Sequence, residues 1–382
     1  MNARMDIINW QSVLTEHQVH LLREFARLPD VKLRIVTSRQ QLAERQMQGW
    51  TPPELSGLDV TTLPVRGWLA AGLRVLRENR TAQHLFCGLW SDRRLFVLLL
   101  YARFSGCKIS LMSEPYADIA AGVLREQSGA KGVLKLWLRR IAYRTAGAML
   151  GAAMHPVFAI SPKAIAQFTR AGFRQDAVVP FGYFVPRMEL PDSHLRAESG
   201  GLRLAFAGGT IQRKGLDIAC DAMRTAVDMG LPLSLDVYGP GEAPVFPPGL
   251  GCIRWRGVIP FGMTQQVVAA YDALIVPSRF DGWAVVVNEA LLQGVPVVAS
   301  DAVGAAAMLS RNGAGFVFPS ENTNALSSLL VSLAREPALL AAARERALAF
   351  RASLLPCVAA RYMRDCYAAM SERTPPPVCV WY

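Results

Sequence analysis

The chain has 382 residues, of which 52% are hydrophobic and 19% are charged. This composition excludes an intrinsically disordered protein. The formal net charge is +11, and residues 1–186 hold all of the excess, with 24 Lys and Arg against 13 Asp and Glu. Residues 187–382 contain 17 of each kind. The asymmetry favours an anionic partner for the first half, and we rank nucleic acid last because no nucleic-acid-binding motif is recognised.

The seven cysteines are scattered, without a C-x-x-C pair or a histidine at metal-ligand spacing. An odd number without a framework favours a reducing compartment over disulfides or structural zinc. The first residues lack the apolar core of a signal peptide, and no run reaches the ~18 apolar residues that span a bilayer. We therefore expect a cytoplasmic protein.

Helical and strand-like runs alternate along the first half. The expected helices are Glu16–Leu28 and Arg94–Phe104. The expected strands are Arg4–Asn9, Val31–Thr37, Val60–Pro64, Gln83–Cys87, Lys108–Ser113, Val157–Ile160 and Val178–Gly182. Such alternation predicts a parallel sheet with crossover helices.

The segment Lys131–Arg144 has a helical period, with apolar side chains on one face and cations on the other. The apolar positions are Leu134, Trp137, Leu138 and Ile141, and the cations are Lys131, Lys135 and Arg139. One interpretation is an interfacial membrane helix. The alternative is an ordinary surface helix that packs its Leu and Trp side chains on the core, and both remain open.

A loop rich in Pro, Gly and polar residues follows Val178–Gly182 and is the expected interdomain linker. Strand–helix alternation then resumes from Leu202 to about Ala349. The last helical stretch is expected over Val358–Met370, and the Pro-rich tail TPPPVCVWY is expected to be loose.

A buried strand, Leu202–Ala207, ends at Gly208-Gly209, and Arg213-Lys214 follow shortly before a helix. Two glycines allow the backbone to approach a ligand closely at the carboxyl end of a strand. The two cations can bind phosphate oxygens there.

The segment 277–299, PSRFDGWAVVVNEALLQGVPVVA, is expected to form a strand end, a loop, a helix and a second strand. The loop holds Asp281, and Glu289 follows eight residues later inside the helix. A helix start attracts phosphate, and a carboxylate about two turns on can accept hydrogen bonds from sugar hydroxyls.

These two segments resemble the retaining glycosyltransferase family 4 (glycosyl transferases group 1), which carries a Glu-x7-Glu signature and a basic pair. The resemblance implies an α/β protein of the GT-B fold, with two Rossmann-like domains facing each other across a cleft. Residues 1–186 would bind the acceptor and residues 187–356 the nucleotide-sugar donor. The helix 357–370 would pack back on the first domain.

The resemblance also assigns roles to residues. Arg213, Lys214, Asp281 and Glu289 would be catalytic, with Glu289 also holding the ribose. The other donor-binding residues would be Gly208, Gly209, Val258, Ile259, Gly282, Trp283, Ala284 and Val285. Two positions depart from the family pattern: Asp281 replaces a Glu, and Ala284 stands where Gly is frequent.

The implied activity is retaining transfer of a sugar from a nucleotide-diphosphate sugar to a glycan or lipid-linked acceptor in bacterial surface polysaccharide synthesis. The resemblance implies no cofactor and no metal, since the chain lacks the D-x-D motif. His17 and Glu114 are the acceptor-binding candidates, because His17 is expected at a helix start that could face the cleft and Glu114 is expected directly after a strand. We expect a peripheral protein at the inner face of the plasma membrane. The alternatives are a transferase or epimerase for small soluble molecules, and a non-catalytic scaffold.

Overall fold

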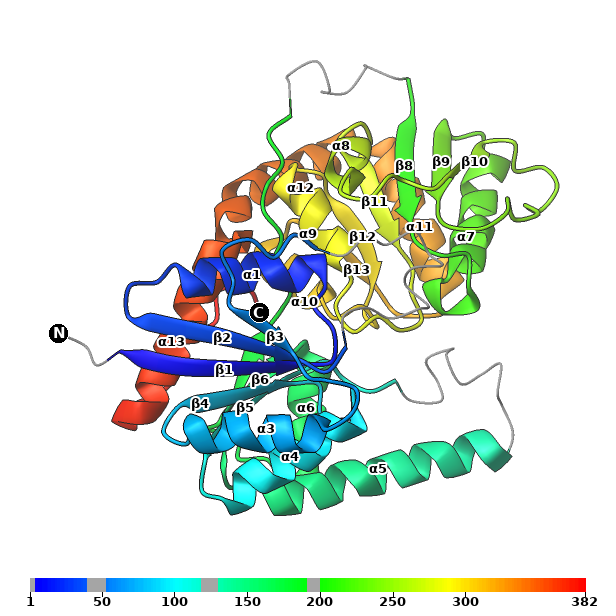
Figure 1. The fold of residues 1–382 in the computed structure, drawn as a ribbon. Coiled ribbons are helices and arrows are strands. Elements are labelled where there is room, and N and C mark those ends of the chain that lie inside the picture. The colour runs from blue at the N-terminus through cyan, green and yellow to red at the C-terminus, as the bar shows by residue number, and fades with distance from the viewer. Residues whose placement is uncertain (1–3, 40–52, 118–129, 191–199) are drawn as a thin grey trace. The chain divides into compact units, whose positions relative to one another are not determined.

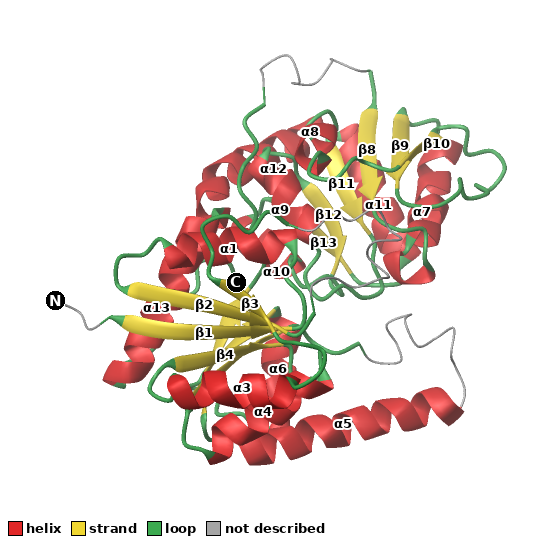
Figure 2. Ribbon diagram, viewed as in Figure 1, coloured by secondary structure: helices red, strands yellow, loops and turns green. Residues whose placement is uncertain are grey.

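The computed structural model describes residues 4–39, 53–117, 130–190 and 200–382. The chain divides into two compact units. The first unit takes residues from the ranges 1–116, 135–185 and 356–380, and the second from 117–134, 186–355 and 381–382. Each unit is a parallel sheet with helices on both faces, which is the α/β class predicted from the sequence (Figure 1, Figure 2).

The first unit has a seven-stranded sheet in the order β3-β2-β1-β4-β5-β6-β7. Its strands are β1 (Met5–Gln11), β2 (Val31–Thr37), β3 (Val60–Thr62), β4 (Gln83–Cys87), β5 (Lys108–Ser113), β6 (Met154–Ile160) and β7 (Val178–Phe181). Its helices are α1 (Glu16–Ala26), α3 (Trp68–Glu78), α4 (Arg93–Phe104), α5 (Ala130–Leu150), α6 (Pro162–Ala171) and α13 (Pro356–Glu372). Residues 130–134 at the start of α5 belong to the second unit. Helices α3 and α4 lie on one face of the sheet, and α1 and α13 lie on the other (Figure 1).

The second unit has a six-stranded sheet in the order β10-β9-β8-β11-β12-β13. Its strands are β8 (Leu202–Ala207), β9 (Leu233–Tyr238), β10 (Ile253–Gly257), β11 (Ala273–Val276), β12 (Val297–Ser300) and β13 (Gly315–Phe318). Its helices are α7 (Leu216–Asp228), α8 (Thr264–Val268), α9 (Val285–Leu292), α10 (Ala306–Asn312), α11 (Thr323–Arg335) and α12 (Pro337–Phe350), with short 3-10 turns η3 (Gln212–Lys214) and η4 (Arg351–Leu354).

Short apolar strands and amphipathic helices explain this architecture. Strand β11 reads ALIV and strand β12 reads VVAS, and all eight residues are buried. Strands covered on both faces need such continuous apolar runs. Because parallel strands end at the same edge, the loops after β8, β11 and β12 meet at one edge of the second sheet.

The carboxyl-terminal segment differs from the expectation of a loose tail. Trp381 is completely buried, and its indole Nε1 donates a hydrogen bond to the carbonyl of Ser353 at 2.8 Å. Composition predicted a loose segment, but burial of the indole ring anchors its end.

No single helix within the described ranges is long and apolar enough to cross a membrane. The residues of α11 together with Pro337–Leu354 meet that test only as a pair bent by 96°.

Candidate functional site

A glycine places two cations at the carboxyl edge of the second sheet. Gly215 has a φ of +71°, and a Cβ at this position would lie 2.0 Å from the carbonyl oxygen of Pro277. Only glycine tolerates both the backbone conformation and this close approach. The turn η3 therefore packs directly on the loop after β11, and this contact brings Arg213 and Lys214 to that loop.

Both cations contact the loop that contains Asp281. The ammonium Nζ of Lys214 lies 2.6 Å from the carboxylate Oδ2 of Asp281, and the guanidinium Nη1 of Arg213 lies 3.8 Å from the same oxygen. Arg213 Nη1 also donates a hydrogen bond to the carbonyl of Phe280 at 2.8 Å. The three side chains remain partly accessible, so a ligand can reach two cations and one carboxylate together.

Arg279 locks this arrangement and was not singled out by the sequence. Its guanidinium donates to the carbonyl of Gln212 at 2.7 Å and pairs with Asp217 at 2.6 Å and Glu321 at 3.1 Å. Its backbone N–H also donates to the carbonyl of Arg213 at 2.8 Å. Two sequence features could have indicated this contact. Asp217 lies two residues beyond the G-x-x-x-x-K-G element, and Arg279 directly follows the Pro-Ser pair.

The loop from Asp281 to Ala284 is held by its backbone. The Gly304 N–H donates to the carbonyl of Asp281, and the Ala305 N–H donates to the carbonyl of Trp283, both at 3.0 Å. The indole of Trp283 is buried and donates to Asn288 at 2.9 Å. This loop leads into α9, whose first N–H groups point away from the helix and are available to an anion.

Ala284 has a φ of +71° in the left-handed region. An L-residue there costs about 1 kcal/mol or more. The departure noted in the sequence therefore carries a physical cost, because glycine would adopt this conformation freely. The strain lies directly at the start of the candidate phosphate-binding helix.

Glu289 lies one turn into α9 and is partly exposed. Burial among its neighbours raises the pKa of its carboxyl to about 7, while a hydrogen bond from the Thr264 side chain opposes that rise. A carboxyl that titrates near neutral pH and has few protein partners is suited to receive hydroxyl donors from a ligand.

Val258 and Ile259 follow β10, at the same edge of the sheet as Gly208 and Gly209. Val258 is 59% exposed, so it is available to a ligand. The sequence analysis did not identify a polar network in this unit. The Tyr271 hydroxyl donates to the Asp236 carboxylate at 2.7 Å, and Arg256 pairs with the same carboxylate at 3.0 Å. These groups come from β9, β10 and the segment just before β11, which sequence spacing does not connect.

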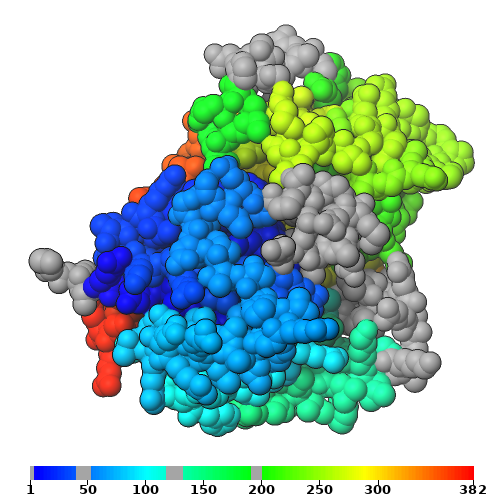
Figure 3. Space-filling view, in the orientation of Figure 1, coloured from blue at the N-terminus to red at the C-terminus, as the bar shows by residue number. Residues whose placement is uncertain are grey.

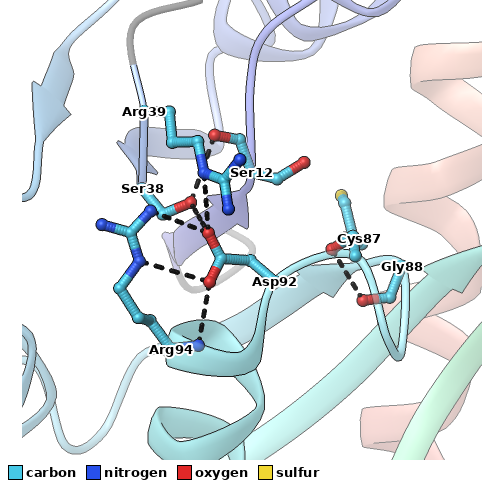
Figure 4. A network of polar contacts seen from close by, with 8 residues as sticks. Ser12, Ser38, Arg39, Cys87, Gly88, Asp92 and Arg94 are labelled. Carbon is cyan, nitrogen blue, oxygen red and sulfur yellow. Dashed lines mark hydrogen bonds and ion pairs between the residues drawn. The ribbon is translucent and has the colours of Figure 1, made fainter. Parts of the chain in front are cut away.

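The first unit has its own polar cluster at the carboxyl ends of β2 and β4, shown in Figure 4. The carboxylate of Asp92 accepts hydrogen bonds from Ser38 Oγ at 2.6 Å and Arg94 Nη2 at 2.8 Å, and it pairs with Arg39 at 3.4 Å. Burial alone would raise the pKa of Asp92, but the bonds from Arg94 and Ser38 hold it at about 2. The sequence analysis did not identify this cluster.

The two acceptor candidates lie beyond the carboxyl ends of two different strands of the first sheet, β5 and β1. Glu114 directly follows β5 and is exposed. His17 lies in the first turn of α1, where Nε2 is 3.1 Å from Thr15 Oγ1 and the ring contacts Tyr183 at 4.6 Å. Glu114 thus lies in a loop, and His17 at a helix start, at the edge where ligands of such sheets bind.

Helix α5 turns its apolar stripe outward. Leu134, Trp137, Leu138 and Ile141 are between 40% and 57% exposed, whereas Leu136, Tyr143, Ala146 and Leu150 are buried. The alternative in which Leu and Trp pack on the core is therefore wrong. The helix attaches to the unit through the other face, and Figure 3 shows it, in teal, at the surface.

The amino-acid sequence matches a family model. Residues 201–336, which contain Arg213, Lys214, Asp281 and Glu289, match the family described as Glycosyl transferases group 1. A search of curated protein sequences finds no significant match.

Solved structures share the fold over nearly the whole chain. Anabaena Alr3699/HepE in complex with UDP and glucose has a TM-score of 0.64 at 15% identity and covers 96% of this chain and 100% of its own. The lipopolysaccharide outer core galactosyltransferase WaaB has a TM-score of 0.65 at 13% identity, covering 96% and 100%. WaaG, a glycosyltransferase involved in lipopolysaccharide biosynthesis, has a TM-score of 0.59 at 17% identity, covering 93% and 98%. The fold is thus the one shared by GT-B glycosyltransferases, and residues 201–336 match the glycosyl transferases group 1 model.

Proposed function

We propose that this protein is a retaining glycosyltransferase that moves a sugar from a nucleotide-diphosphate sugar to a hydroxyl of a glycan or lipid-linked acceptor. The observation that carries the proposal is the meeting of Arg213 and Lys214 with Asp281 beside the start of α9. A diphosphate needs clustered positive charge in a partly enclosed site, and this cluster supplies it.

The chemistry follows from the charges. As the bond between the anomeric carbon and the phosphate oxygen breaks, the negative charge of the leaving group is stabilised by Arg213, Lys214 and the N–H groups around Gly282–Val285. The acceptor hydroxyl attacks the same face of the sugar and passes its proton to the departing phosphate. No cofactor takes part, and the protein cations replace a metal in this scheme.

Two carboxylates orient the donor in this proposal. Glu289 accepts hydrogen bonds from the ribose hydroxyls, and Asp281 is assigned to the donor sugar. Asp281 holds Lys214 in the structure at 2.6 Å, so binding of a diphosphate replaces or shares this ion pair. Gly208, Gly209, Val258, Ile259, Trp283 and Ala284 complete the proposed donor-binding set.

We further propose that the enzyme acts at the inner face of the plasma membrane, where surface polysaccharides are assembled from lipid-linked acceptors. The outward apolar stripe of α5 supports this, because large exposed apolar patches mark interaction surfaces. The described part of α5 contains Lys135, Arg139, Arg140 and Arg144 and no Asp or Glu. Cations flanking a Trp-containing apolar stripe fit an anionic bilayer surface.

The test is thermal stabilisation by UDP, GDP and ADP, with and without EDTA. A ligand that binds the native state at 100 times its Kd adds about 2.7 kcal/mol to the unfolding free energy. We expect one nucleotide to stabilise the wild type, the Lys214→Ala variant to lose that effect, and the Arg335→Ala variant, which removes an exposed Arg from α11, to keep it. Absence of stabilisation by any nucleotide would favour the scaffold alternative.

The stereochemistry is tested separately by following the product anomer with NMR. A retained anomeric configuration is expected, and activity should survive EDTA. An inverted product, or metal-restorable loss of activity in EDTA, would contradict the mechanism.

A further inference from the structure

An aromatic pocket lies in the first unit at the carboxyl ends of two neighbouring strands. It has a volume of about 490 Å³ and is lined by Trp90, Tyr116, Leu138, Arg139, Ala142 and Tyr143. Trp90 and Tyr116 each come three residues after a strand, β4 and β5 respectively. This edge of the sheet is where ligands of such folds bind, and the volume falls in the usual range for ligand pockets.

The aromatic walls of the pocket are fixed in place. Gly88, with a φ of +78°, turns the chain after β4, and Ser91 Oγ donates to the carbonyl of Cys87 at 2.9 Å. Trp90 then stacks on Phe96 with ring centroids 4.2 Å apart. Trp90 nevertheless remains 44% exposed, so one part of the indole is presented to solvent.

The opposite wall is held by a paired hydrogen bond. The side-chain amide of Gln167 accepts from the Tyr116 N–H and donates to the Tyr116 carbonyl, both at 2.9 Å. The Tyr116 ring packs on Tyr143 with centroids 4.6 Å apart. Fixed aromatic rings bind an apolar group with little loss of conformational entropy.

Charge identifies the chemistry of the ligand. Arg139 is the one charged side chain among the six lining residues, and none of them is acidic. A half-buried guanidinium next to aromatic rings favours a phosphate attached to an apolar group, because it binds two phosphate oxygens at once.

Leu138 belongs both to the pocket and to the outward stripe of α5. A ligand whose phosphate lies at Arg139 can therefore pass Leu138 with its apolar chain and continue along Trp137 and Ile141 on the same helix. We propose that this pocket binds the phosphate-bearing end of an amphipathic acceptor, with its apolar chain along α5. The proposal rests on the proposed function, since it identifies the acceptor as an alkyl or polyprenyl phosphate derivative.

The probe is dodecyl phosphate below its micellar concentration, compared by calorimetry with dodecyl maltoside and with inorganic phosphate. We expect saturable one-to-one binding of dodecyl phosphate, and binding at least tenfold weaker for the other two. The Arg139→Gln and Leu138→Asn variants should each weaken it by tenfold or more. The control Arg170→Gln removes the same charge from an exposed position of α6 in the same unit, outside the pocket, and should bind within twofold of wild type.

Equal losses in Arg139→Gln and Arg170→Gln would overturn the pocket, because general charge attraction would then explain the binding. If dodecyl maltoside binds as tightly as dodecyl phosphate, the phosphate has no role in recognition. If inorganic phosphate binds as tightly as dodecyl phosphate, the apolar chain has no role. Nucleotide stabilisation is measured on the same variants. If no nucleotide binds wild type while dodecyl phosphate still occupies the pocket, the proposed function fails and the pocket stands.

Discussion

The two units are built alike but use their charges differently. In the second unit Arg213, Lys214 and Arg279 are tied to carbonyl and carboxylate oxygens of the neighbouring loops. In the first unit the cations of α5 border an exposed apolar stripe. A parallel sheet supports both arrangements because its loops and outer helices vary independently of the core. In the proposed function, the buttressed cations of the second unit serve a small polar diphosphate, and the surface of α5 serves a large amphipathic partner.

The strongest test of this separation is removal of one cation from the second unit. Lys214→Ala or Arg213→Ala should lower the transfer rate about 100- to 1,000-fold, by analogy with deletion of an oxyanion donor worth about 2.7–4 kcal/mol. The transfer rate is measured by steady-state kinetics. The donor is a nucleotide-diphosphate sugar that carries the nucleotide found to stabilise the wild type. Vesicle binding by these variants should equal that of wild type. Turnover within threefold of wild type would remove the two cations from the mechanism.

The second test uses the raised pKa of Glu289, about 7. If the ionised carboxylate accepts the ribose hydroxyls, nucleotide binding should weaken about tenfold between pH 8 and pH 6, because the carboxylate becomes protonated. Calorimetric titration of nucleotide at both pH values measures this. The Glu289→Gln variant should bind the nucleotide more weakly than wild type at pH 8. Its affinity should not show the tenfold change between pH 6 and pH 8 that the carboxyl causes in wild type.

The same group affects stability with a defined sign. A carboxyl whose pKa is raised in the folded state contributes stability below its unfolded pKa, and that contribution is lost as pH rises toward 7. Glu289→Gln should therefore be more stable than wild type at pH 8 by on the order of 2–3 kcal/mol. The two proteins should differ little at pH 4.5. A variant that is less stable at pH 8 would contradict the assigned pKa.

A third test addresses the first unit. Replacing Trp137 and Ile141 together by Ser should weaken binding to anionic vesicles at least tenfold, since each half-buried apolar side chain contributes about 1 kcal/mol at an interface. Sedimentation with vesicles at low and high salt measures the effect, and wild-type binding should fall with salt. The control, Met229→Ser with Val245→Ser, changes exposed apolar residues of the second unit. Equal binding by all three proteins would exclude α5 as the membrane surface.

The smallest expected effect concerns Asp281. Its ion pair with Lys214 competes with a diphosphate, and partly exposed pairs are worth about 1 kcal/mol or less. Asp281→Asn should therefore bind the nucleotide about three- to fivefold more tightly while transferring sugar more slowly. Titration calorimetry compares it with Glu242→Gln, an exposed carboxylate of the same unit. Weaker nucleotide binding by Asp281→Asn would show that Asp281 does not compete for Lys214.

Local patterns in the sequence predicted the two α/β units, because buried parallel strands and their crossover helices have characteristic lengths and apolar content. The glycines after β8 and the position of Glu289 in a helix were likewise local features. The ion pair of Lys214 with Asp281 joins residues 67 positions apart, and the Asp92 cluster joins β2 to β4. Contacts of this kind depend on which strands become neighbours, which no single segment specifies.

Helix α5 shows a further limit of sequence patterns. The spacing of Leu134, Trp137, Leu138 and Ile141 places them on one face, and the structure agrees. The spacing does not determine whether that face meets the core, because a membrane-facing and a core-facing stripe have the same period. Smaller side chains on the other face, such as Ala146 and Gly147, allow the closer approach to the unit: a Cβ on Gly147 would lie 1.8 Å from the carbonyl of Ala171.

Helix α13 has a consequence for how the protein is made. The hydroxyl groups of Tyr367 and Ser110 are 2.8 Å apart, and Tyr367 packs edge-on against Phe158 at 5.5 Å. During synthesis, α13 leaves the ribosome after the stretch 186–355. Strands β5 and β6 therefore remain without their covering helix while most of the second unit, except residues 381–382, is already available to fold. A fragment that stops at residue 186 would leave Phe158 and Phe181 uncovered and should aggregate. A fragment in which a short linker joins residue 186 to residues 356–380 should restore a soluble first unit.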